Sequence, residues 1–231
     1  GFANAVSWQS ARRTGEGYAS WVSRRLQRLV RPLVPVLIVW ALLASAARWL
    51  GFSAESIRIS SQVAFVPTWF LAVYVLVVLA APATYSLWCR FGIGSFAALV
   101  ASAVAVDCAR LVFGPSPLGW LNYAFVWLAF HQLGYAWRDG RLSGPARALP
   151  WAAGGLAALL LLVGFASYPI SMITVPGEAL SNSNPPTLAL LALGVVHAGV
   201  LLAAERPVRR WLVRDRVWTA TVLVNGAVMT L

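Results

Sequence analysis

The chain has 231 residues, of which 60% are hydrophobic, and its mean hydropathy is +0.73. Long apolar runs account for this composition, and because no soluble core needs so many of them, the sequence excludes a water-soluble enzyme. The formal net charge is +11, and all 18 basic residues are arginines. These arginines flank the apolar runs and would first meet anionic lipid head groups, so we expect lipid head groups as partners and no nucleic acid.

The apolar runs predict an all-α fold, a polytopic bundle of transmembrane helices. Most of the runs approach the ~20 residues that cross a hydrocarbon core of ~30 Å. We expect residues 1–231 to form a single membrane-embedded domain that opens on the end of a truncated helix. About seven spans are expected, at residues 32–50, 66–88, 94–113, 118–137, 149–168, 187–204 and 217–231.

The arginines fall into alternate gaps between these runs, which allows the orientation to be predicted. Fifteen of the 18 lie in four gaps, and the intervening gaps hold only Arg48, Arg58 and Arg110. Cytoplasmic loops of membrane proteins carry the excess of positive charge. We therefore expect a multi-pass protein of the cell membrane with residues 9–31, 88–92, 138–148 and 205–216 on the cytoplasmic side.

The first of these gaps, residues 9–31, predicts an arginine-rich loop followed by an amphipathic surface helix that leads into the next span. Arg25 and Arg28 share one face of that helix, and Arg31 extends the stripe. Guanidinium groups at this spacing can clamp phosphates. The alternative is that they only set the topology and touch lipid phosphates.

Polar side chains within the apolar runs are the other candidates for function. His131 and Gln132 lie inside one predicted span, where His131 can serve either in proton transfer or in a hydrogen bond to a neighbouring helix. Asp107 has Arg110 three residues later, so an ion pair competes with a role as a buried proton acceptor. Asn122 can cap a helix or face a cavity.

The sequence contains no recognisable metal or cofactor motif. Cys89 and Cys108 are about 19 helical residues, or ~28 Å, apart along one predicted span, so they cannot pair locally. No zinc spacing, phosphate-binding loop or dinucleotide fingerprint is present, and we expect neither a metal nor a tightly bound cofactor.

Several segments together resemble membrane-bound acyltransferase family 3, in particular its actinobacterial branch. The resemblance covers nearly the whole chain, and it is carried by residues 24–32, by Trp69-Phe70-Leu71-Ala72-Val73-Tyr74, and by residues 118–123, 131–140, 181–193 and 225–231.

The resemblance implies about ten helices in an intact protein and transfer of an acyl group. The expected donor is a cytoplasmic acyl-CoA-type cosubstrate, and the expected acceptor is a hydroxyl of a sugar, glycolipid or cell-wall glycan. It associates Arg25 and Arg28 with function, and with Arg31, Gln132, Trp69 and Asn122 they form our substrate-binding candidates.

The family's candidate general base is a histidine on the first membrane helix, and by this comparison the chain begins within the second and stops before the C-terminal end. We therefore expect that base to lie outside the chain, and a fragment of this kind to be inactive. His131 and Asp107 remain as weaker catalytic candidates. The alternative function is a transporter or flippase for a lipid-linked saccharide, which would line its pathway with the same polar residues.

Overall fold

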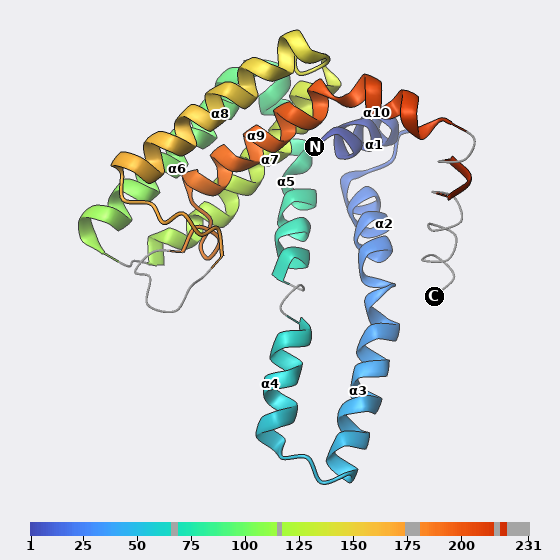
Figure 1. The fold of residues 1–231 in the computed structure, drawn as a ribbon. Helices are drawn as coiled ribbons and strands as arrows, with labels where there is room; N and C mark the ends of the chain where they lie inside the picture. Colours follow the sequence, from blue (N-terminus) through green and yellow to red (C-terminus); the bar gives the residue numbers. More distant parts are fainter. Residues whose placement is uncertain (66–68, 115–116, 174–180, 215–217, 221–231) are drawn as a thin grey trace.

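The computed structural model describes residues 1–65, 69–114, 117–173, 181–214 and 218–220, and within these ranges the chain is helical without a named strand. Figure 1 shows how the helices are arranged. Their bounds are α1 Phe2–Arg13, α2 Tyr18–Val30, α3 Leu33–Trp49, α4 Ala54–Phe65, α5 Trp69–Phe91, α6 Ile93–Phe113, the short 3₁₀ helix η2 Pro117–Leu121, α7 Asn122–Arg138, α8 Pro145–Phe165, α9 Leu188–Ala203 and α10 Glu205–Leu212.

Six of these helices, α3 and α5–α9, coincide with predicted spans. Length and hydropathy give four candidate membrane spans among the described residues, or up to five if the bent pair of α9 and α10 is one span. α7 with 17 residues and α9 with 16 are shorter than a typical crossing, so about seven spans are not confirmed. The predicted span at 217–231 lies almost entirely outside the described residues.

The structure adds detail to the first third of the chain. α2 leads into α3, and by length and hydropathy the two helices together form one 32-residue candidate span from Tyr18 to Trp49. Pro32 and Pro35 stand at the start of α3, where the first turn of a helix tolerates proline. The gap at 51–67 contains a further helix, α4.

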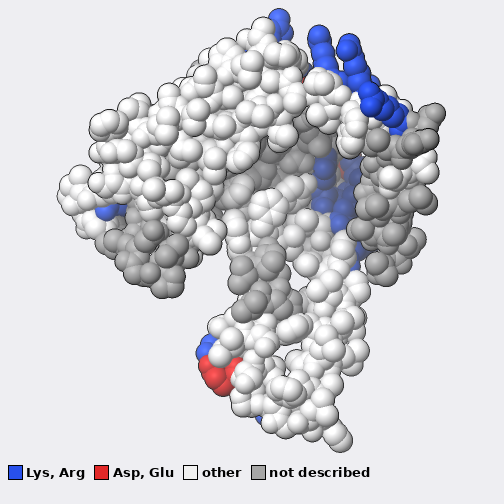
Figure 2. Space-filling model, in the orientation of Figure 1, with Lys and Arg blue, Asp and Glu red and all other residues white. Residues whose placement is uncertain are grey.

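The arginine-rich connections gather at one end of the bundle. In Figure 1 the turns that follow α1, α5, α7 and α9 lie toward the top, whereas η2, the end of α8 and the start of α9 lie at the opposite end. Figure 2 shows basic side chains at this upper end and in the recess beside α2. The alternation of charge along the sequence therefore corresponds to two distinct ends of the fold.

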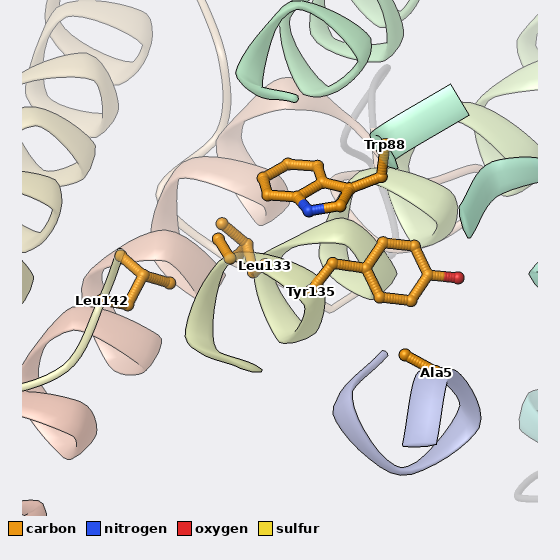
Figure 3. Packing of buried hydrophobic residues seen from close by; sticks show 6 residues of the cluster. Ala5, Trp88, Leu133, Tyr135 and Leu142 are labelled. Atoms are coloured by element: carbon orange, nitrogen blue, oxygen red, sulfur yellow. The ribbon is translucent and has the colours of Figure 1, made fainter. Parts of the chain in front are cut away.

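Helix α7 lies at the centre of the packing. Tyr135 and Leu133 of α7 pack with Trp88 of α5, Ala5 of α1 and Leu142 in the turn before α8 (Figure 3). Closer to the other end, buried side chains of α6, α7 and α9 form a further cluster of Ala103, Val126, Ala129 and Leu191. A central helix with neighbours on several sides places its polar side chains in contact with different helices.

Candidate active site

A pocket of about 620 Å³ lies between α1 and α2, and basic side chains form much of one wall. Trp21 and Val22 are the buried residues of α2, which turns the arginine face of that helix toward the open side. Arg24, Arg25 and Arg28 therefore line the pocket. The opposite wall comes from α1 and carries hydroxyl side chains. We call this the arginine pocket.

The three arginines are engaged to different extents. Arg24 forms an ion pair with Glu16, and Arg25 donates from Nη2 to the backbone oxygen of Ala3 at 2.9 Å. Arg28 forms neither an ion pair nor a side-chain hydrogen bond with the described part of the chain. Because a guanidinium carries five N–H donors, Arg25 and Arg28 keep donors for an anion that enters the pocket.

The arginine pocket differs from the predicted stripe in three residues. Arg31 lines a separate, mainly apolar groove along α2 and α3 and does not join Arg25 and Arg28. Arg24 and Glu16 belong to the pocket but were not among our candidates. The i, i+4 spacing of Arg24 and Arg28 was visible in the sequence, but which face of α2 meets α1 depends on tertiary packing.

His131 lies on the side of α7 that meets α1. It is buried, and its Nε2 is 3.0 Å from Nδ2 of Asn4 on α1, while its Nδ1 has no hydrogen-bond partner among the described residues. The Tyr135 ring meets the imidazole edge-on, with ring centroids 4.9 Å apart. Since buried polar atoms are normally satisfied, an unpaired Nδ1 is the feature that keeps a chemical role for His131 open.

Gln132 and Asp107 take part in separate groups of hydrogen bonds. Gln132 accepts a hydrogen bond at 2.9 Å from the hydroxyl of Ser95, which joins α7 to α6. Asp107 accepts hydrogen bonds from Nδ2 of Asn122 at 2.8 Å, the hydroxyl of Tyr168 at 2.9 Å and the backbone N–H of Leu188 at 2.9 Å. We call this the Asp107 cluster, and it ties α6, α7 and α9 to the connection after α8.

The Asp107 cluster holds its hydrogen-bonded groups firmly. Arg110 approaches the carboxylate at 3.5 Å, and the side chains of Arg110 and Asp107 are only 8% and 3% exposed. Burial and the adjacent Asp107 raise the pKa of the Tyr168 phenol, so it remains a neutral donor. Four donors around one carboxylate occupy its acceptor positions, which favours a structural role for Asp107.

The two catalytic candidates are far apart. Asn122, which contacts Asp107, and His131 are separated by nine residues of one helix, a rise of about 14 Å. Asp107 and His131 therefore cannot act on the same reacting atom in this arrangement. The sequence named both correctly as buried polar residues, but it did not contain the information that Asp107 of α6 meets the start of α7 whereas His131 lies near the middle of α7.

Trp69 belongs to an aromatic group near the start of α5. Its ring centroid lies 6.4 Å from that of Tyr123 and 6.0 Å from that of Trp127, both on α7. The Trp127 Nε1 is buried without a hydrogen-bond partner among the described residues. Trp69 is thus close to aromatic side chains of the central helix but belongs neither to the arginine pocket nor to the Asp107 cluster.

A family model described as an acyltransferase domain, Acyl_transf_3, matches residues 1–230. The chain belongs to the acyltransferase 3 family. No curated protein matches the chain, and no solved structure matches it. Together with the apolar helices, the family match identifies a membrane acyltransferase.

Proposed function

We propose that this acyltransferase 3 family member transfers an acyl group from an acyl-CoA-type donor on the cytoplasmic side to a hydroxyl of a sugar, glycolipid or cell-wall glycan. The observation that carries the proposal is the arginine pocket, a basic cavity at the arginine-rich end of the bundle. Such donors bear phosphates at one end and the thioester at the other. In a multi-pass arrangement of about seven spans within this chain, that end faces the cytoplasm.

Arg25 and Arg28 would hold the donor phosphates through charge-assisted hydrogen bonds. Arg25 is already held in place by its bond to the Ala3 oxygen and by its position 5.7 Å above the Trp21 ring. Preorganised guanidiniums lose less conformational freedom on binding than free ones. Since α1 carries both Ala3 and Asn4, the pocket and His131 contact adjacent residues of one helix.

The transfer itself needs no redox step or metal. The acceptor oxygen attacks the thioester carbonyl, a base takes the hydroxyl proton, the C–S bond breaks and the departing thiolate is protonated. His131 is the titratable candidate closest to the arginine pocket through α1. If His131→Ala in the full-length protein retains full acyl transfer, His131 has no catalytic part in the reaction.

Calorimetry of acyl-CoA binding to the detergent-solubilised full-length protein tests the proposal. We expect Arg25→Ala/Arg28→Ala to weaken binding at least about 100-fold, since each charge-assisted bond contributes about 1.5–3 kcal/mol. The matched control is Arg48→Ala/Arg58→Ala, which removes the same charge from exposed positions near the α3–α4 turn. Absence of donor binding in the wild-type protein would favour a transporter or flippase for a lipid-linked saccharide.

A further inference from the structure

A second basic pocket lies on another side of α1, and none of the residues considered so far as candidates lines it. Its volume is about 490 Å³, and its lining consists of Gln9, Arg12 and Arg13 of α1 with Tyr85 and Cys89 of α5. Cys89 is an exposed free thiol. We call this the Cys89 pocket.

Arg12 and Arg13 are available to a ligand. Both are exposed, and neither forms an ion pair or a side-chain hydrogen bond with the described residues. Their place in the last turn of α1 complements the helix dipole, which accounts for their charge but not for a pocket beside them. No acidic side chain lines this pocket.

Two residues that line the Cys89 pocket, Gln9 and Tyr85, form a hydrogen-bonded triad with Arg138 of α7. Arg138 of α7 donates to the Tyr85 hydroxyl at 2.9 Å and also to the side-chain oxygen of Gln9, whose amide nitrogen in turn donates to Tyr85. The Tyr85 oxygen thus accepts two hydrogen bonds, one from Arg138 and one from Gln9. Asp139 lies 3.4 Å from Arg138, so its carboxylate offsets the charge of Arg138 but not the charges of Arg12 and Arg13.

We propose that the Cys89 pocket binds a phosphate group, held by Arg12 and Arg13. Two unpaired guanidinium groups in one pocket suit the oxygens of a phosphate monoester or diphosphate. The phosphate can come from the 3′-phosphate of a CoA-type donor whose diphosphate occupies the arginine pocket, or from the head group of an anionic lipid. The donor source rests on the proposed function, whereas the lipid source is independent of it.

Cys89 provides a direct reporter of occupancy. The experiment measures the rate of maleimide labelling of Cys89 in a Cys108→Ser background. The nucleotide arms contain acetyl-CoA or its analogue lacking the 3′-phosphate. The lipid arms contain no nucleotide and compare nanodiscs of neutral lipid with nanodiscs of anionic lipid. We expect one phosphate source to slow labelling at least about fivefold. Protection by acetyl-CoA but not by the analogue identifies the donor, and protection by anionic lipid alone identifies the head group.

The protection must depend on the two arginines. Arg12→Gln/Arg13→Gln should restore the unprotected rate, and Arg206→Gln/Arg209→Gln, an exposed pair on α10, should not. Cys108 in a Cys89→Ser background should label at one rate in all conditions. The inference is overturned if no phosphate source protects Cys89, or if protection persists without Arg12 and Arg13.

The two proposals fail in distinguishable ways. Calorimetry could show acetyl-CoA binding that depends on Arg25 and Arg28 while Cys89 stays unprotected under every condition. That result would refute the phosphate site in the Cys89 pocket and leave the proposed function intact. If acetyl-CoA does not bind, but anionic lipid protects Cys89 in a manner that depends on Arg12 and Arg13, the proposed donor is refuted and the phosphate site in the Cys89 pocket is supported.

Discussion

The Asp107 cluster yields a quantitative prediction that separates a structural from a catalytic carboxylate. Asp107→Ala removes the acceptor of three hydrogen bonds and leaves Arg110 buried without its counter-ion. Hydrogen bonds between helices of membrane proteins contribute about 0.6 kcal/mol each on average, so three of them give a lower bound of about 2 kcal/mol for the loss in the free energy of unfolding. Loss of one partner of a buried ion pair gives an upper bound of about 5 kcal/mol.

Equilibrium unfolding in mixed micelles measures this loss. We expect Asp107→Ala to lower the free energy of unfolding by about 2–5 kcal/mol within these bounds, and Asp107→Asn by less, because an amide still accepts hydrogen bonds. Tyr168→Phe, which removes one of the three bonds, should cost about 1 kcal/mol. Acyl transfer per folded molecule should stay close to wild type. An Asp107→Asn protein with normal stability and lost turnover would refute the structural interpretation.

Further predictions concern packing, donor affinity and pH. Gly155→Ala places a Cβ 2.9 Å from a backbone oxygen of α9 and should cost about 1–3 kcal/mol in unfolding assays, whereas its neighbour Gly154 has nothing within 4 Å, and Gly154→Ala should stabilise slightly. Glu16→Gln frees Arg24 and should tighten donor binding by up to about fivefold in calorimetry, and a weaker affinity would contradict this. The pKa of Tyr168 is raised on folding. The contribution of the Tyr168 phenol to the free energy of unfolding is therefore fully present below the unfolded pKa of about 10 and is lost as the pH rises further. The stability difference between wild type and Tyr168→Phe should therefore shrink above about pH 10, and a constant difference would contradict the shift.

The sequence predicted the helical framework closely because hydrophobic length is a local property. The run at 94–113 became α6 at Ile93–Phe113, and the run at 187–204 became α9 at Leu188–Ala203. The structure adds most where local signals are ambiguous. Pro32 can begin a new helix, and it can also stand at the junction between two consecutive helices, as it does between α2 and α3. The polar stretch at 51–67 is compatible with a loop and with a short exposed helix.

The candidate site was predicted as a set of residues but not as an arrangement. Arg25 and Arg28 share a pocket, as their spacing suggested, because i, i+3 residues share a helix face. The burial of His131 followed from its apolar surroundings, but its contact with Asn4 joins residues 127 positions apart. Single-sequence patterns contain no information about such pairs.

The most direct test of the central claim follows the acyl group itself. Membranes that contain the full-length protein are supplied with a donor labelled in its acyl carbonyl, and ester-linked label in the saccharide and lipid fractions is measured. The account predicts label transfer that is lost in Arg25→Ala/Arg28→Ala and retained in Arg48→Ala/Arg58→Ala. Transfer that is unaffected by loss of Arg25 and Arg28, or saccharide that crosses the membrane without acquiring label, would contradict it.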